Sequence, residues 1–319
     1  MNFFNIACIT DDNYAQHAGV MLYSLLSHSS CPCRIFLLTN SLNNENKNKL
    51  EKTVMHFSNS FIQFIVITNE DLNFSEYSIG NQSRQWVSIM YMKLFIHNLL
   101  PQEIKKILFL DVDIIVNDDI KKLYTTNIDK CIIAAAEDWK YSYFAKERLG
   151  LAYDDIYINS GVMLINLSRW REKEAHNPIQ QFMINNKKLF INDQDVIALY
   201  FKDEIQYIPQ EWNVTTFYFE RVPRIPDKYI PLRQEICTNP RIIHFCAPIK
   251  PWFKECRHPY RKLYKNILEK TPWHNYQYPS CKTYLGIPAW QYMIKYWLNK
   301  LHIRNDDWYL LPIKNNLHS

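Results

Sequence analysis

Two aspartates separated by one residue, Asp111 and Asp113, are the side chains of this chain best suited to chemistry. They follow the apolar run from Ile107 to Leu110, which is typical of a buried strand, and more apolar residues come after them. Two carboxylates this close repel each other and are costly to bury, and a divalent cation removes both penalties. Carboxylate oxygens suit a hard ion such as Mg²⁺ or Mn²⁺. The motif alone leaves a second interpretation open, in which one acid caps the next element and the other is solvated.

Further polar clusters follow or interrupt other apolar segments. They are Asp11-Asp12-Asn13, Asn159-Ser160-Gly161, Asp193-Gln194-Asp195, and His244 with Lys250. Each cluster has a simpler explanation: His244 suits a core histidine, Lys250 a surface lysine, Asp193 a helix cap and Asn159 a strand bulge. Taken together, they supply a hard-metal site, a cation for a diphosphate and polar groups for a sugar.

The elements that must position these clusters alternate along the chain. Apolar runs predict strands, and apolar residues at helical spacing predict helices between them. The predicted strands span residues 3–9, 34–38, 61–67, 107–110, 132–136, 156–167 and 241–246, and the predicted helices span 18–26, 43–57 and 86–99, with further helices beginning near 168 and 195. This alternation predicts an α/β fold with a mostly parallel sheet flanked by helices. Ligands bind such sheets at the carboxyl ends of the strands, which is where the polar clusters lie.

The composition bounds the class of protein. With 319 residues, 47% hydrophobic and 22% charged, the chain is expected to be a soluble globular protein of one large domain or two unequal ones. Only five glycines are present, so a Gly-rich phosphate loop is excluded. We expect no secretory signal and no membrane-spanning helix. Eight scattered cysteines favour a reducing cytoplasm over a disulfide framework.

The C-terminal end differs from the rest in charge. From Lys254 onward there are eleven Lys and Arg against four Asp and Glu, a net charge of +7, which leaves −2 for residues 1–253. Apolar residues at helical spacing occur there at 290, 293, 294, 297, 298 and 301. A basic amphipathic helix with Trp on its apolar face suits a membrane interface, although such a stripe can also pack on its own domain.

The motifs in this order resemble those of the retaining family-8 glycosyltransferases, in particular bacterial lipopolysaccharide and lipooligosaccharide α-galactosyl- and α-glucosyltransferases. The matching segments are Thr10 to Tyr14, Phe109 to Val116, Ile158 to Leu167 with Trp170, Asn192 to Asp195, and Ile243 to Trp252, within residues 3–256. The resemblance implies a GT-A fold, with residues 1–256 as the catalytic domain and 257–319 as a basic, aromatic, membrane-associating region with a small helical tail. Several motifs in a fixed order are far more specific than one.

The resemblance also implies roles for individual residues. Asp111, Asp113 and His244 would hold Mn²⁺ or Mg²⁺, which bridges the diphosphate of a UDP-sugar donor. Asp11 and Asn13 would contact the uridine, Tyr14 would stack on the uracil, and Asp12, Val112 and Ala247 would lie along the nucleotide. Lys250 would neutralise phosphate oxygens, and Asn159, Asp193 and Gln194 would meet the donor sugar.

These residue types suit transfer of a hexose with retention of its α configuration. A cation and Lys250 stabilise the charge that develops on the departing UDP. Retention ordinarily suggests a covalent carboxylate intermediate, but Gln194 occupies the position that best faces the sugar, and an amide is a poor nucleophile. We therefore expect front-face attack by the acceptor hydroxyl, with Gln194 and Asp193 stabilising the sugar and the leaving phosphate taking the proton.

Two departures from the family pattern concern the donor. Tyr91 stands where we expect the usual Arg of the helix before the aspartate strand, which leaves the donor hexose open between galactose and glucose. Ala247 replaces a usual Gly before Pro248.

The expected acceptor is a lipid-anchored oligosaccharide. The enzyme would be peripheral on the inner face of the cytoplasmic membrane, its C-terminal tail on the anionic surface, with no nucleic acid as partner. Alternatives are another glycan or glycoprotein acceptor, a self-glucosylating transferase, an inactive scaffold, and a haloacid-dehalogenase-like hydrolase; Ile114 and the late position of the motif argue against the last.

Overall fold

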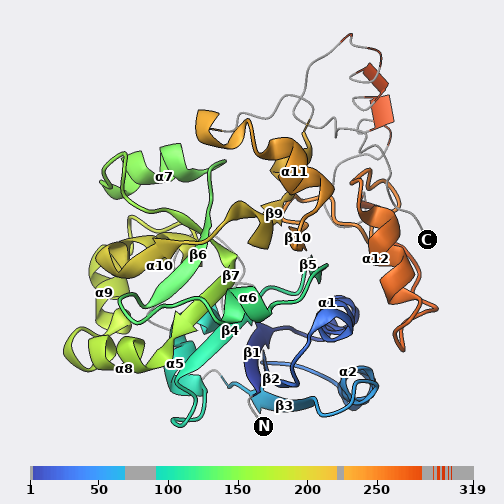
Figure 1. Ribbon diagram of the computed structural model, residues 1–319, viewed down its shortest axis with the longest axis horizontal. Coiled ribbons are helices and arrows are strands. Elements are labelled where there is room, and N and C mark those ends of the chain that lie inside the picture. Colours follow the sequence, from blue (N-terminus) through green and yellow to red (C-terminus); the bar gives the residue numbers. More distant parts are fainter. Residues whose placement is uncertain are drawn as a thin grey trace.

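A single large sheet organises the chain. The computed structural model describes residues 3–68, 91–220 and 226–281, together with residues 290, 293, 294, 297, 298, 301 and 303. In these residues seven strands form one sheet in the order β3-β2-β1-β4-β7-β6-β8 (Figure 1). The strands are β1 Phe4–Ile9, β2 Cys33–Thr39, β3 Phe61–Val66, β4 Lys106–Leu110, β6 Ile133–Glu137, β7 Ile158–Asn166 and β8 Ile205–Tyr207.

The sheet is mixed and mostly parallel, as the sequence predicts. β1, β2, β3 and β4 pair in parallel, as do β6 and β8, whereas β7 runs antiparallel to both β4 and β6. Because β7 is reversed, its first residues lie at the edge where β4 ends, with Val162 opposite Leu110. The polar residues that follow β4 and those that begin β7 are therefore brought together.

Helices cover both faces of the sheet because strand side chains alternate in direction. Ile6 and Cys8 belong to one hydrophobic cluster, and Ala7 and Ile9 belong to the other. The first face carries α1 Ala15–His28, α2 Asn44–Met55, α6 Lys121–Tyr124, α11 Arg233–Thr238 and α12 Arg261–Leu268. The second face carries α5 Ile96–Leu99, α7 Ser142–Leu149, α8 Leu167–His176, α9 Ile179–Asn186 and α10 Asp193–Tyr200. Short 3-10 helices are η2 Lys93–Phe95, η3 Lys202–Glu204, η4 Gln210–Trp212, η5 Thr216–Phe219 and η6 Asp227–Tyr229.

A second, three-stranded sheet lies beside the end of β4. It has the order β5-β10-β9 and consists of β5 Ile114–Val116, β9 Val214–Thr215 and β10 Ile242–His244. Ile114 is paired with His244 in an antiparallel register. Since Ile114 directly follows Asp113, this register places His244 beside the second aspartate.

The C-terminal region begins as part of the packed fold. Tyr264 and Leu268 of α12, and Trp273 after it, are buried in the same hydrophobic cluster as α1. The predicted division after residue 256 stays a prediction, and buried packing continues to Cys281. No helix in the described ranges is both long enough and apolar enough to cross a membrane.

His258 makes the stability of the fold depend on pH. Its buried ring lies 4.8 Å from the ring of Phe219 and 4.7 Å from that of Phe245, measured between centroids. Its Nδ1 accepts the backbone N–H of Tyr260, and its Nε2 has no hydrogen-bond partner among the described residues. Burial lowers the pKa of His258 to about 3. The unfolded chain, with a pKa near 6.5, therefore binds a proton that the folded chain excludes, and stability is lost as pH falls below about 6.5.

We predict that His258→Phe reduces this acid sensitivity. Urea unfolding at pH 7.5 and pH 5 should show the wild-type protein losing roughly 2 kcal/mol more than the variant over this interval, since each pKa unit is worth about 1.4 kcal/mol. The exposed His274, changed to Phe in the same way, is the control and should leave the pH dependence as it is. An unchanged slope in His258→Phe would contradict the prediction.

Candidate active site

A cavity of about 470 Å³ opens at the edge where β1 and β4 end and β7 begins. It is lined by Ile9, Thr10, Asp11, Tyr14, Lys93, Phe109, Asp111, Val112, Asp113, Asn159, Ser160, Gly161, Asp193, Gln194, His244, Cys246 and Lys250. The structure thus brings together residues from all the predicted polar clusters. This is the edge at which ligands of such sheets bind.

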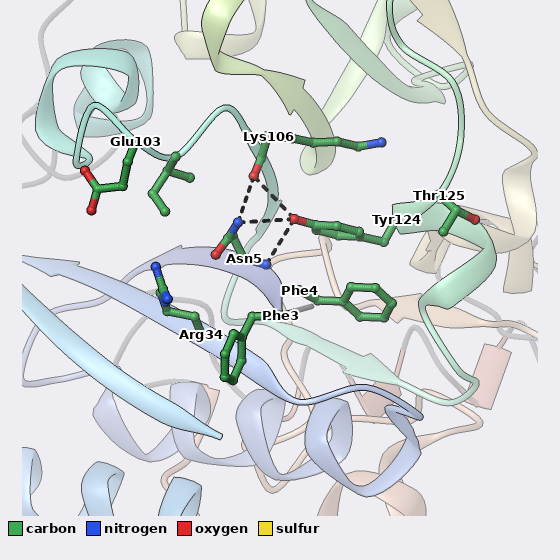
Figure 2. A pocket seen from close by; sticks show the side chains of 9 residues that line it. Phe3, Phe4, Asn5, Arg34, Glu103, Lys106, Tyr124 and Thr125 are labelled. Carbon is green, nitrogen blue, oxygen red and sulfur yellow. Dashed lines mark hydrogen bonds between the residues drawn. The ribbon is translucent and has the colours of Figure 1, made fainter. Parts of the chain in front are cut away.

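A larger cavity, of about 620 Å³, opens at the opposite, amino ends of β1, β2 and β4 (Figure 2). Its central polar groups bind one another: the Asn5 backbone N–H donates to the Tyr124 hydroxyl at 3.1 Å, and Asn5 Nδ2 donates to the Lys106 carbonyl at 3.4 Å. Its lining holds a single carboxylate, Glu103, and no histidine. Size alone therefore does not identify the reactive site, and the chemistry lies at the other edge.

Asp111, Asp113 and His244 form the one group in the described part of the chain that could hold a metal ion. One ligand atom from each lies within 4.8 Å of the others. The His244 Nε2 is 3.3 Å from Asp113 Oδ1. Two carboxylates and an imidazole suit Mn²⁺, and Mg²⁺ is compatible with the carboxylates. The donor set therefore fits the predicted metal.

A chain of amide side chains fixes the tautomer of His244. The Gly161 backbone N–H donates to Asn159 Oδ1 at 3.1 Å, which marks that atom as an acceptor; Asn159 Nδ2 then faces Asp138 Oδ2 at 3.2 Å, and Asn159 Oδ1 also accepts from Asn213 Nδ2 at 2.9 Å. Asn213 Oδ1 then faces His244 Nδ1 at 2.9 Å and can only accept. His244 must carry its proton on Nδ1, which leaves Nε2 free to bind a metal. Asp138 and Asn213 are functional residues that the sequence did not reveal.

The same carboxylate orients Gln194 at the start of α10. Gln194 Nε2 donates to Asp138 Oδ2 at 3.0 Å, and Gln194 Oε1 accepts from the Ser160 backbone N–H at 3.1 Å. Ser160 Oγ donates to Asp193 Oδ2 at 2.8 Å. Asp195 completes the capping box of α10 and accepts from Arg148 and the Tyr157 hydroxyl, so it holds the helix rather than facing the cavity.

Each aspartate of the central motif has a lysine beside it. Lys93 Nζ lies 3.2 Å from Asp111 Oδ1 and 3.2 Å from Asp193 Oδ2, and Lys250 Nζ lies 2.7 Å from Asp113 Oδ2. Burial raises the pKa of Asp111 above its ordinary value, although Lys93 opposes the rise. Burial acts on Asp113 in the same direction, but Lys250 and then His244 outweigh it and hold the pKa of Asp113 well below its ordinary value.

Lys93, and not Tyr91, is the residue of its segment that reaches the cavity. We expected Tyr91 to lie toward the donor sugar, but its side chain is buried in the hydrophobic core. The predicted continuous helix breaks into the 3-10 helix η2 and then α5, which changes the direction of each side chain. Residues 86–90 of that predicted helix lie outside the described residues. Arg171 holds the end of α5 by donating to the carbonyl oxygens of residues 97, 100, 101, 102 and 104.

The residues predicted to bind the nucleotide divide into two groups. Asp11, Tyr14 and Val112 line the cavity, and Asp11 Oδ1 accepts the backbone N–H of Tyr14 at 2.9 Å. Asp12 instead accepts from Asn43 and Asn46 at the start of α2. Asn13 and Ala247 are also outside the cavity lining, and their contacts with a nucleotide remain predictions.

Comparison with known proteins agrees with this geometry. The model of glycosyl transferase family 8 matches residues 5–256. General stress protein A of Bacillus subtilis is 28% identical over 86% of this chain and 96% of its own length, and lipopolysaccharide 1,2-glucosyltransferase of Escherichia coli is 24% identical over 84% and 78%. The crystal structure of the galactosyltransferase LgtC with donor and acceptor sugar analogues matches with a TM-score of 0.70 at 22% identity, over 84% of this chain and 96% of that one. The fold is therefore the predicted GT-A fold, and the chain belongs to glycosyltransferase family 8.

Proposed function

We propose that the protein is a metal-dependent, retaining hexosyltransferase. It moves galactose or glucose from a UDP-sugar to a sugar of the lipopolysaccharide or lipooligosaccharide core. The observation that carries the proposal is the Asp111–Asp113–His244 group beside Lys250 and Gln194 in one cavity of a family-8 chain. Two similar proteins, a lipopolysaccharide 1,2-glucosyltransferase and a galactosyltransferase, support this class of substrate.

At one end of the cavity, Asp11 and Tyr14 bind the uridine, with Tyr14 against the uracil, and Asn13, just outside the cavity lining, contacts it as well. Asp111, Asp113 and His244 would hold Mn²⁺ or Mg²⁺, and the bound ion would neutralise diphosphate charge. Lys250 donates to phosphate oxygens that become more negative as the sugar leaves. We also propose that Asp12, Val112 and Ala247 lie along the nucleotide.

At the sugar end, Asn159, Asp193 and Gln194 surround the donor hexose. Asp193 Oδ2 already accepts from Ser160 and pairs with Lys93, which makes it a poor nucleophile. Gln194 is held in place by Ser160 and Asp138, so its amide oxygen can stabilise positive charge at the anomeric carbon without moving. The acceptor oxygen then bonds to the anomeric carbon as the bond to the β-phosphate oxygen breaks, and the acceptor proton passes to that phosphate. Both changes occur on one face, which retains the configuration.

Family membership excludes one alternative, the haloacid-dehalogenase-like hydrolase. Activity assays distinguish the remaining alternatives, which concern the donor hexose, a different glycan or glycoprotein acceptor, and self-glucosylation.

The C-terminal tail supports binding at a membrane. Trp290, Ile294, Trp297 and Leu301 are each about half exposed or more, and the described residues among 290–298 are helical. The predicted tail residues between and beyond these positions lie outside the described residues. An exposed apolar helix in a basic segment suits an anionic surface, so we propose that the enzyme is peripheral on the inner face of the cytoplasmic membrane.

We predict that the protein hydrolyses UDP-galactose or UDP-glucose slowly and transfers the hexose when a lipooligosaccharide acceptor is added. UDP-N-acetylglucosamine serves as a third donor, and released UDP is measured with Mn²⁺ and with excess chelator. Asp113→Asn should reduce turnover by at least about 100-fold, because one charged metal ligand is lost. Turnover that is indifferent to chelator, or absent with all three donors, would refute the proposed function.

Gly161 provides a second prediction about the metal site. A Cβ at this position would lie 2.4 Å from His244 Cε1 and 2.9 Å from Asp111 Oδ2. Gly161→Ala should therefore push two ligands apart and weaken Mn²⁺ binding by roughly 10- to 100-fold, the range found when ligand orientation is disturbed. Free Mn²⁺ is measured by electron paramagnetic resonance. Val162→Ala, on the next residue of β7, controls for destabilisation of the strand and should retain the affinity; equal losses in both variants would mean that the effect is not local.

Deleting residues 282–319 should separate membrane binding from catalysis. Truncation after Cys281 keeps the hydrogen bonds from Ser280 Oγ and the Cys281 N–H to Glu255, so the packed fold remains. We expect donor hydrolysis to persist and sedimentation with anionic phospholipid vesicles to be lost. Trp297→Ala should weaken vesicle binding, and Met55→Ala, another exposed apolar residue, should not. Vesicle binding that survives truncation would exclude the tail as the anchor.

A further inference from the structure

Asp113 has one of its carboxylate oxygens occupied by a lysine. Oδ2 lies 2.7 Å from Lys250 Nζ, whereas Oδ1 lies 3.3 Å from the unprotonated His244 Nε2. Lys250 Nζ also donates to the Phe245 carbonyl at 2.6 Å. A metal ion that binds Asp113 must therefore compete with an ammonium group already seated on the same carboxylate.

The two lysines of the site differ in how firmly they are held. Lys93 contacts Asp111, Asp193 and Ser160, and its side chain is 9% exposed. Lys250 contacts one carboxylate and one carbonyl, its side chain is 17% exposed, and it lies after β10 outside any helix or strand. Lys93 would leave two carboxylates, the buried Asp193 and the partly buried Asp111, uncompensated if it moved, whereas Lys250 can swing on its long side chain. Lys250 is therefore the one that can exchange partners.

Charge balance shows what such an exchange requires. Asp111 and Asp193 share Lys93, and Asp113 is paired with Lys250. A divalent cation that arrives alone at Asp113 lies close to the Lys250 ammonium, a like charge in a partly buried site. A diphosphate that arrives with the cation lowers this repulsion and offers the displaced ammonium new oxygen partners.

We propose that Lys250 occupies Asp113 in place of the metal while no nucleotide is bound, and that it transfers to the diphosphate when metal and UDP-sugar bind together. The exchange makes metal and nucleotide binding cooperative. The diphosphate gives the displaced Lys250 new partners when the metal binds, and the metal frees Lys250 from Asp113 for the diphosphate. The inference rests on the proposed function for the identity of the metal and the diphosphate. It goes further because Lys250 competes with the metal for Asp113 before the UDP-sugar binds.

The test measures Mn²⁺ affinity of the full chain by electron paramagnetic resonance, without nucleotide and then with saturating UDP. In wild-type protein, UDP should raise Mn²⁺ affinity by more than the free UDP–Mn²⁺ equilibrium explains. Lys250→Met should bind Mn²⁺ alone about tenfold more tightly, because the competing charge is gone, and should lose most of the UDP enhancement. Lys250→Arg keeps the charge and should behave as wild type. Lys228→Met, which removes a lysine paired with Glu137 outside the cavity, is the matched control.

Other outcomes are equally informative. Unchanged or weaker binding of Mn²⁺ alone by Lys250→Met would overturn the exchange while leaving a metal-dependent transferase intact. No binding of Mn²⁺ by the wild-type protein, with or without UDP, would instead remove the proposed metal site itself. Lys250→Gln, which retains a hydrogen-bond donor to the Phe245 carbonyl, gives the same measurement if the methionine variant does not fold.

Discussion

The site depends on the cost of holding two carboxylates, Asp111 and Asp113, at the end of a buried strand. Each would be unstable there without compensation, since burial favours the neutral acid and the two charges repel. The fold supplies that compensation from distant segments. The 3-10 helix η2 brings Lys93, β10 brings His244, and the following loop brings Lys250. The arrangement that makes the motif tolerable in the protein is also the one that can hold a divalent cation.

A second carboxylate site, Asp138 at the end of β6, links the two halves of the chemistry. Through Asn159 and Asn213 it sets the proton on His244, and through a direct hydrogen bond it orients Gln194. One buried acid therefore orders both His244 and Gln194. Burial raises the pKa of Asp138, while hydrogen bonds from Gln194 and Asn159 oppose the rise, so the network that it orders favours its charged form.

The sequence predicted six of the seven strands of the large sheet and much of the cavity lining, because strands end where polar residues begin; it missed the short β8, and the strand predicted at 241–246 belongs to the second sheet as β10. It placed Asp111, Asp113, His244 and Gln194 together through the order of motifs. It missed Asp138, Asn213 and Lys93 for a physical reason. Their roles depend on the register of strands far apart in sequence and, for Lys93, on where a helix changes to 3-10 geometry, and neither leaves a local pattern. The polar break at Asn159-Ser160-Gly161 marks a place where Gly161 lies against His244, with too little room for a Cβ.

The C-terminal region differs along its length, which its net charge alone does not show. His17, near the start of α1, stacks on Trp252 with ring centroids 3.6 Å apart, and its Nδ1 lies 2.6 Å from the Tyr264 hydroxyl of α12. Trp252 also meets the ring of Tyr14 edge-on. Because Tyr14 lines the cavity, α12 supports this part of the candidate site through the aromatic cluster. The basic character of the whole region is shared, but its first part packs against the candidate site, whereas Trp290, Ile294 and Leu301 lie exposed in the tail.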